Sequence, residues 1–258
     1  MSSADLDVLA IAAHRDDIEQ TCGGTLAKMA ALGQRTGILD LTRGELGTRG
    51  NADDREQEAI AAAKILRVSW RAALDIPDGR VENTHENRLK IASVIRLTRP
   101  RVVILPYWLG RHPDHYTCST LGYEACFLAG LAKLDLSSVS PDALHTSLTT
   151  GDQQLATAPH RPFKILYATL YYDVRPTFVV DITKQFEAKL ASILAYKSQF
   201  SDQEAGKEIF PAAAEIRTRV ESMARFYGML AGVEHAEPFL QKEVGLVEDV
   251  TAIPVKSI

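Results

Sequence analysis

The chain has 258 residues, a net charge of −4 and 46% hydrophobic residues, a composition typical of a globular protein. It lacks the basic excess of a nucleic-acid-binding protein, and no apolar run approaches the roughly 18 residues that a membrane span needs. The N-terminus shows no basic stretch of a signal peptide, and three cysteines are too few for a disulfide framework. We therefore expect a cytoplasmic protein that binds neither nucleic acid nor membrane.

The first half of the chain alternates between buried-strand and helix patterns. Strands are predicted at residues 7–13, 35–41, 72–74 and 102–105. Helices are predicted at residues 17–32, 55–66 and 86–97. Paired glycines at 23–24 interrupt the first helix pattern and permit close packing. Such alternation predicts a Rossmann-like α/β fold, with a mostly parallel sheet and helices on both faces.

The second half is expected to complete the same domain, so that residues 1–258 form a single one. Residues 134–161 are rich in Ser, Thr, Asp and Pro without a clear period, and we expect a long loop or flap that shapes the pocket. The remaining predicted elements are a helix at 117–132, strands at 164–169 and 178–181, and helices at 183–200 and 212–230. Asp181 or Thr183 is expected to cap the helix at 183–200.

Two clusters of imidazole and carboxylate each follow a predicted strand. His14 and Asp17 come after the first strand, and His112 and His115 follow the strand at 102–105. Ligands of open α/β sheets bind outside the carboxyl ends of the strands. Each pair is three residues apart, so both members can face one point on a first helical turn. Because zinc takes histidine nitrogen and carboxylate oxygen, the two clusters together predict the metal site of a hydrolase.

Asp16 lies beside these candidate ligands and is placed to take the proton of a metal-bound water, whose pKa the ion lowers toward ~7. A spare imidazole could stabilise the oxyanion or protonate the leaving group. An amide is the obvious substrate bond, because its nitrogen leaves poorly unless protonated. Two imidazoles and one carboxylate accept zinc, Fe(II) or Co(II), so the residues leave the metal open. Either cluster alone also fits carboxylates stabilised at a helix N-terminus.

These segments resemble a known family. Ala-His-Arg-Asp-Asp at 13–17 and His-Pro-Asp-His at 112–115 look like the two signatures of the PIG-L/LmbE-like zinc-dependent N-deacetylases. Matches that are similar to the subgroup making bacillithiol lie at 41–50, 55–59, 111–115, 178–182 and 195–200. The resemblance implies removal of the acetyl group from an N-acetylglucosaminyl substrate, GlcNAc-malate in that subgroup. It also implies a homo-oligomer, often a hexamer.

The resemblance assigns catalytic roles residue by residue. Asp16 matches the general base of the family. His112 matches the group that acts as acid and binds the oxyanion, and Asp114 is expected to orient it. The zinc ligands of the family are matched by His14, Asp17 and His115.

Further matches concern the substrate. Tyr196 matches a tyrosine that helps bind the oxyanion, although a core tyrosine would fit the same helical pattern. Arg55 matches an arginine that holds sugar hydroxyls, although it could be a surface residue at a helix start. Asp78 is expected to act likewise or to be a plain turn residue. Arg111 and Arg49 are weaker candidates for a substrate carboxylate, since guanidinium groups suit carboxylates.

Arg15 departs from the family, which usually carries proline or a small residue there. Without the fixed φ of proline the turn that aims His14 and Asp17 is expected to loosen, and a cation beside the metal would compete with it. Alternatively, Arg15 points outward or contacts an acidic substrate group.

Three rival functions remain open at this point. The first is a thiol-conjugate amidase or a deacetylase of another glycan. The second is a metal- or sugar-binding protein without activity, although the complete acid/base set argues against it. A nucleotide-binding Rossmann module is disfavoured, because no G-x-G-x-x-G follows the first strand.

Overall fold

The computed structural model describes residues 5–140, 144–149, 158–170, 173–202, 206, 208 and 211–255. An eight-stranded sheet in the order β5-β3-β2-β1-β4-β6-β8-β7 runs through these residues. The pairs β1–β2, β1–β4, β2–β3 and β4–β6 are parallel, whereas β5, β7 and β8 enter antiparallel pairs. The strands are β1 (Val8–Ala12), β2 (Thr36–Asp40), β3 (Trp70–Leu74), β4 (Val102–Pro106), β5 (Leu144–Leu148), β6 (Lys164–Ala168), β7 (Phe178–Asp181) and β8 (Ala236–Leu240).

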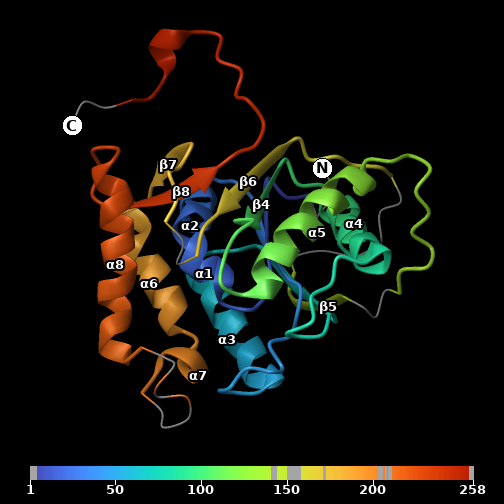
Figure 1. Cartoon of the computed structure of the whole chain (residues 1–258), viewed down its shortest axis with the longest axis horizontal. Helices are drawn as coiled ribbons and strands as arrows, with labels where there is room; N and C mark the ends of the chain where they lie inside the picture. Colours follow the sequence, from blue (N-terminus) through green and yellow to red (C-terminus); the bar gives the residue numbers. More distant parts are fainter. Residues whose placement is uncertain are drawn as a thin grey trace.

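Helices cover both faces of the sheet, as Figure 1 shows. They are α1 (Asp17–Thr21), α2 (Gly23–Ala31), α3 (Ala52–Ile65), α4 (His85–Thr98), α5 (Pro113–Ala129), α6 (Phe186–Leu194), α7 (Lys197–Phe200) and α8 (Ala213–Met229). Leu9 and Ile11 of β1 pack in the core that α4 and α5 cover, whereas Val8 and Ala10 pack with α1, α2 and α3. This alternation buries β1 on both sides, which confirms the predicted α/β fold. No helix within the described ranges is long and apolar enough to cross a bilayer.

The segment expected as a long loop contains a strand. Residues 144–148 form β5, which pairs antiparallel with β3 at the edge of the sheet. Its residues are only half-buried, so its sequence Leu-His-Thr-Ser-Leu lacks the apolar run of the central strands. Residues 141–143 and 150–157 of the flap predicted at 134–161 lie outside the described residues. Strand β8 was not expected either.

The helix expected at 183–200 is interrupted. A 3₁₀ turn at Thr183–Gln185 precedes α6, and the chain leaves helical geometry at Tyr196, whose φ is −81° and ψ 71°, before α7 begins. The Asp181 carboxylate accepts hydrogen bonds from the Thr183 amide (2.9 Å) and hydroxyl (2.6 Å) just before the turn, but the N-cap residues are Ile182 for the 3₁₀ turn and Gln185 for α6, so the expected cap by Asp181 or Thr183 is wrong. The interruption has a tertiary cause, because the Tyr196 ring is completely buried against Ala59 and Ala62 of α3.

The glycine pair at 23–24 begins α2 and permits the expected close approach. A Cβ on Gly24 would lie 2.8 Å from Cδ1 of Ile182 and 3.0 Å from Oε1 of Glu237. The Gly24 amide instead donates a hydrogen bond to the Glu237 carboxylate (2.9 Å). This contact joins the first helices to β8, far away in the sequence.

Candidate active site

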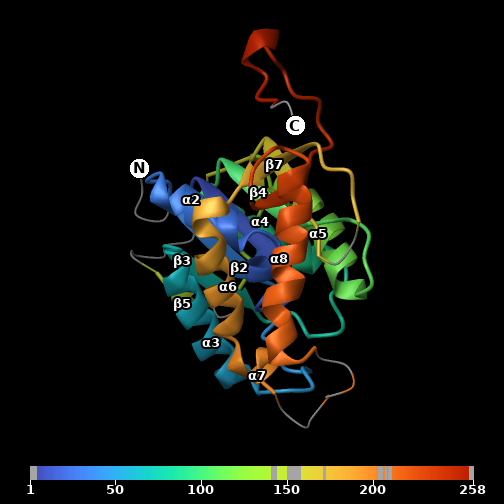
Figure 2. The ribbon, with the colours of Figure 1, turned by 90° about the vertical axis from the view of Figure 1, so that its left-hand side faces the viewer.

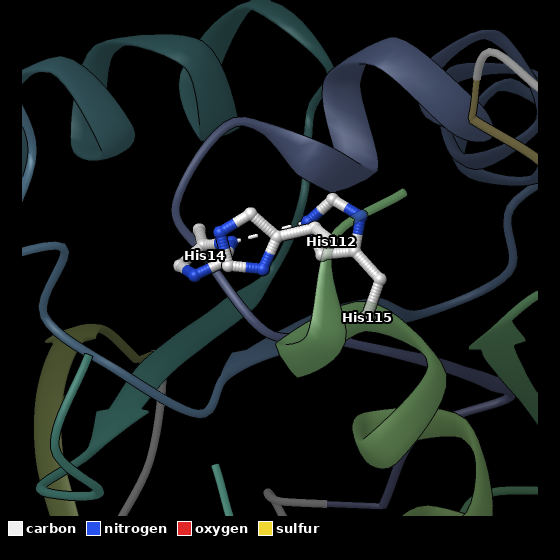
Figure 3. A group of neighbouring side chains, drawn as sticks. All are labelled: His14, His112 and His115. Atoms are coloured by element: carbon white, nitrogen blue, oxygen red, sulfur yellow. Dashed lines mark hydrogen bonds between the residues drawn. The ribbon is translucent and has the colours of Figure 1, made fainter. Parts of the chain in front are cut away.

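The sheet topology brings the two clusters together. Strands β1 and β4 are parallel neighbours, so the turn after β1 and the segment after β4 leave the sheet at the same edge. The first carries His14, and the second reaches α5 with His112 as its N-cap residue. Figure 3 shows the three imidazoles gathered at this edge. The ring centroids lie 4.7 Å (His14–His112), 4.9 Å (His112–His115) and 5.2 Å (His14–His115) apart.

Three donor atoms form a small triangle that fits one divalent cation. His14 Nδ1 lies 3.2 Å from His115 Nε2, Asp17 Oδ2 lies 3.3 Å from His115 Nε2, and Asp17 Oδ2 lies 3.5 Å from His14 Nδ1. Ligand atoms about 2.0–2.1 Å from a tetrahedral zinc ion stand roughly 3.4 Å from one another. The donor set and its spacing therefore suit zinc, and the set leaves a fourth position for water or substrate.

The charge balance of the site favours the same occupant. Within the described residues, four carboxylates lie around the imidazoles, and one arginine, Arg55, contacts them. The carboxylates are those of Asp16, Asp17, Asp78 and Asp114. Burial lowers the pKa of His14, but contacts with Asp114, Asp17 and Asp78 more than offset burial and hold this pKa well above its usual value. Burial also lowers the pKa of His115, which Asp17 raises by more. The surplus of buried negative charge is what a bound cation would neutralise.

Asp78 and Asp114 both face the outer nitrogen of His14. His14 Nε2 lies 3.1 Å from Asp78 Oδ1 and 3.4 Å from Asp114 Oδ2. A metal-binding histidine typically turns its second ring nitrogen toward a carboxylate, which fixes the tautomer and aims the other nitrogen at the ion. The pair would thus present Nδ1 of His14 to the cation.

This placement differs from the expectation for both carboxylates. Asp114 was expected to orient His112, but its carboxylate accepts hydrogen bonds from the amides of Gly79 (2.8 Å) and Val81 (3.3 Å) and points at His14. Asp78 was expected to hold the sugar or to be a plain turn residue; its Oδ2 accepts a hydrogen bond from the Leu46 amide (3.0 Å), and its Oδ1 faces His14. The turn at 77–79 comes close to α5 only in the folded chain, so local sequence did not reveal these contacts.

His112 is oriented by the backbone instead. The Asp114 amide donates a hydrogen bond to His112 Nδ1 (3.2 Å), as in an N-cap. Nδ1 therefore acts as an acceptor, which leaves the proton of the neutral ring on Nε2. Burial, followed by the charges of His14 and His115, lowers the pKa of His112. The residue is exposed and thus presents a neutral N–H donor at the mouth of the site.

Asp16 sits in an unusual backbone conformation next to Arg55. Its φ is 125°, in the region that normally favours glycine. Asp16 Oδ1 lies 3.1 Å from Arg55 Nη2, and Gln20 Nε2 donates to Oδ2 (3.3 Å). Burial raises the pKa of Asp16 to about 7, although Arg55 opposes the rise. Arg55 also donates to the backbone carbonyl of Arg15, so the guanidinium holds this turn, and its burial contradicts the alternative of a surface residue at a helix start.

The Tyr196 hydroxyl lies outside the group of His14, His112 and His115 with its carboxylates, which we name the imidazole cluster. It donates a hydrogen bond to Glu19 Oε1 (3.0 Å) in a buried network that we name the Arg71 cluster: Glu19, Asp40, Arg71 and Tyr196. Arg71 Nη1 donates to Glu19 (2.6 Å), and its Nε and Nη2 bind Asp40 at 2.9 and 3.0 Å. The Tyr196 ring lies beneath Arg55, 5.7 Å from its guanidinium carbon. The Tyr196 hydroxyl is therefore buried beneath Arg55 and bonded to Glu19, and its expected role at the oxyanion stays a prediction.

The remaining arginines separate into buried and exposed residues. Arg15 is completely buried and directed at α3, with Nη1 3.5 Å from the Ala52 carbonyl and Nη2 4.0 Å from Glu56, so it does not point outward. Arg49 is also buried and donates to the backbone carbonyls of Gln199 and Ser201 (3.2 Å each), which ties the loop before α3 to α7. Arg111 is exposed next to His112.

Sequence reasoning did not identify the Arg71 cluster. One signal was available, because Arg71 lies inside the apolar strand β3 and Asp40 ends the apolar strand β2. A charged residue in a buried strand requires a charged partner.

Comparisons with known proteins agree with this geometry. Residues 9–126 match the family model described as PIG-L, GlcNAc-PI de-N-acetylase. Diacetylchitobiose deacetylase of Thermococcus kodakarensis is 32% identical over 240 residues, which cover 89% of this chain and 80% of that protein. The conserved protein TT1542 of Thermus thermophilus superimposes with a TM-score of 0.76 at 36% identity, over 94% of this chain and 98% of its own.

A second solved structure gives the same result. N,N'-diacetylchitobiose deacetylase of Pyrococcus horikoshii superimposes with a TM-score of 0.70 at 26% identity, over 91% of this chain and 83% of its own. Both matches extend well beyond the two signature segments. We therefore identify the chain as a member of the PIG-L family of de-N-acetylases, enzymes that hydrolyse an amide bond.

Proposed function

We propose that the chain removes the N-acetyl group from an N-acetylglucosaminyl substrate with the help of a divalent cation, zinc in the first instance and Fe(II) or Co(II) as alternatives. The observation that carries this proposal is the triangle of His14 Nδ1, Asp17 Oδ2 and His115 Nε2, with sides of 3.2–3.5 Å. The family description and two relatives named for diacetylchitobiose support an acetylated sugar as the substrate.

The reaction is an addition of water to the amide carbonyl followed by loss of the amine. His14, Asp17 and His115 would hold the cation, which when bound would polarise the carbonyl and lower the pKa of water. Asp16 takes a proton from the attacking water. Nε2–H of His112 donates to the oxyanion as the carbonyl oxygen becomes negative. The C–N bond then breaks as the protonated Asp16 passes the proton that it took from water to the leaving nitrogen, and acetic acid and the free amine result.

Neighbouring residues keep these groups in position. Asp78 and Asp114 hold the ring of His14 from behind, at 3.1 and 3.4 Å. Arg55 holds Asp16 at 3.1 Å and the backbone of the same turn. Because a small displacement of a reacting group lowers the rate steeply, we assign these three residues to positioning.

The finer substrate proposal is GlcNAc-malate, which would place the enzyme in bacillithiol biosynthesis. Arg111 supports it, because an exposed guanidinium beside His112 suits the carboxylates of malate. A thiol-conjugate amidase or a deacetylase of another glycan is the second candidate. A cytoplasmic location, a homo-oligomer and one domain over residues 1–258 remain predictions from the sequence.

An amine-release assay combined with metal analysis tests the proposal. The purified chain, loaded with zinc, is offered GlcNAc-malate, diacetylchitobiose, N-acetylglucosaminyl-inositol and a thiol conjugate. We expect one bound ion per chain and release of amine from at least one N-acetyl sugar. Asp16→Asn tests the base, and Asp53→Asn is the matched control, because the Asp53 side chain is 92% exposed. Stoichiometric zinc without amine release from any substrate would favour the metal-binding protein instead.

A further inference from the structure

A narrow cavity, which we name the near cavity, lies against two of the proposed metal ligands. Asp17 and His115 form part of its wall. The last residues of β1, β4 and β6 also line it: Ala12, Pro106 and Ala168. The rest of the wall is mostly apolar and includes Ile18, Ile104, Leu105, Tyr107 and Leu109. The near cavity therefore offers an apolar surface next to the point where the amide carbonyl would be attacked.

The near cavity has the size of a methyl group. Its volume is about 20 Å³. Since about 10–15 Å³ holds one water molecule, and a methyl group is only slightly larger, one such group fills it. The sugar of the substrate is polar and bulky, so it extends towards solvent, where His112 is exposed. The acyl group is the apolar substituent of the amide, and the near cavity suits it.

A second cavity, which we name the deep cavity, lies behind the first. Its volume is about 60 Å³, which gives room for roughly four groups of the same size. Residues of α1, α6, α8 and β8 line it, and Figure 2 shows α6 and α8 side by side on this face of the molecule. Its apolar wall includes Val220, Met223, Ala224, Tyr227 and Ala236.

The two buried charged residues of the deep cavity neutralise each other. Lys189 Nζ lies 2.5 Å from Glu237 Oε1 and also donates a hydrogen bond to the Gln20 carbonyl (2.7 Å). The Glu237 carboxylate accepts further hydrogen bonds from the amides of Gly24 (2.9 Å) and Thr25 (2.6 Å). Because these charges are paired within the protein, the remaining space suits an uncharged alkyl chain rather than an ion.

Two described residues belong to the walls of both cavities, Thr21 and Leu170. Thr21 is buried and fixed, because its hydroxyl donates a hydrogen bond to the Asp17 carbonyl (2.8 Å). Leu170 follows β6 and is half-buried. These two side chains separate a space that fits one methyl group from a larger apolar space.

We propose that Leu170, together with Thr21, restricts the acyl group of the substrate to acetyl by closing the near cavity towards the deep cavity. The inference rests on the proposed deacetylase function and names the part of the chain that selects the acyl group. With Leu170 in place, the two further carbons of a butyryl group would meet its side chain. Without it, they extend into the deep cavity, where burial of each CH₂ group favours binding.

A series of acyl groups tests this assignment. Glucosaminyl-malate and chitobiose carry acetyl, propionyl or butyryl on nitrogen, and kcat/KM for amine release is measured with the zinc-loaded chain. We expect the unchanged chain to prefer acetyl over butyryl at least about 10-fold. Leu170→Ala should raise the ratio of butyryl to acetyl about 10-fold. Leu230→Ala is the matched control and should keep the ratio, because Leu230 is 47% exposed after α8 and lines neither cavity.

A second substitution tests where the longer acyl chain lies. Met223 lines the deep cavity and is 38% exposed, so a larger side chain fits there without displacing the core. Met223→Trp in the Leu170→Ala chain should fill the deep cavity and cancel the gain with butyryl.

Three results would overturn the proposal. They are equal use of acetyl and butyryl by the unchanged chain, an unchanged ratio in Leu170→Ala, and a gain that Met223→Trp leaves intact. Failure of the proposed function itself is recognised separately, because the acetyl substrates would then release no amine either.

Discussion

Two buried polar clusters lie next to each other around α1, and the charges of their carboxylates are compensated in different ways. In the Arg71 cluster, one guanidinium binds both Asp40 and Glu19, and all three side chains are at most 1% exposed. In the imidazole cluster, carboxylates outnumber the arginine that touches them. In the Arg71 cluster both carboxylates bind one guanidinium, and Arg15 lies near enough to Asp40 for their charges to interact. A cluster whose carboxylates all bind a guanidinium supports the fold, whereas one whose carboxylates mostly face imidazoles depends on a bound cation. The partners of the carboxylates thus separate the structural cluster from the reactive one.

The largest effect is expected on removing a member of the metal triangle. His115→Ala should abolish zinc binding and reduce amine release to background, because two donor atoms hold a catalytic ion poorly. Metal content and the rate are measured on the same sample. His85→Ala, at an exposed position on α4, is the control. Retained stoichiometric zinc in the variant would contradict the ligand set.

Asp16→Asn keeps the triangle and removes the base. The rate should fall about 10²–10⁴-fold, the usual contribution of a general base, while zinc content stays the same. The comparison of kcat with bound zinc separates this effect from metal loss. A variant with an undiminished rate would exclude Asp16 as the base.

Arg71→Met removes the guanidinium that binds Asp40 and Glu19 in the Arg71 cluster. Two buried carboxylates lose their partner, and we expect the free energy of unfolding to fall by about 3–5 kcal/mol. Urea unfolding measures the loss. Arg217→Met is the control, because Arg217 pairs with Glu187 on the surface and its loss should change stability little. Equal stability of the two variants would show that the Arg71 cluster does not support the fold.

Asp78→Asn tests the support of His14. The amide keeps the size of the side chain but not its charge, so the affinity for zinc should fall about 10–100-fold. Competition with a chromogenic chelator measures the affinity. Asp75→Asn, at a neighbouring exposed position, should leave it unchanged. If both variants bind zinc as tightly as the unchanged chain, Asp78 does not position His14.

Tyr196→Phe is expected to have the smallest effect. Loss of the hydrogen bond to Glu19 should cost about 0.5–1.5 kcal/mol of stability and leave kcat unchanged. A tyrosine that bound the oxyanion would instead lower kcat about 10²–10³-fold. The ratio of kcat values for the two proteins therefore decides between the two positions of this hydroxyl group.

The central fold could be predicted because strands β1 and β4 are apolar throughout. Val8–Ala12 and Val102–Pro106 read as buried strands from composition alone. The strand Leu144–Leu148 could not be recognised in the same way. It lies at the edge of the sheet, where its residues are only half-buried, and the three residues between its leucines are polar. The interruption at Tyr196 depends on contacts with α3, more than a hundred residues away in the chain.

The candidate site was predictable only as far as it is local. The places of the two clusters after predicted strands indicated that they converge, and Figure 3 shows the rings of His14, His112 and His115 together. The partners of Asp78, Asp114 and Arg55 depend on how turns and helices from different parts of the chain meet. From residue type alone these side chains are expected to form polar contacts, but only the tertiary structure shows which residues they contact.

The backbone at Asp16 has a practical consequence. A non-glycine residue with φ of 125° carries conformational strain of about 1–3 kcal/mol. Glycine at this position would relieve that strain and remove the carboxylate at once. Directed evolution screened for heat resistance alone would therefore tend to discard the reactive group, and any such campaign on this scaffold should select for turnover in every round.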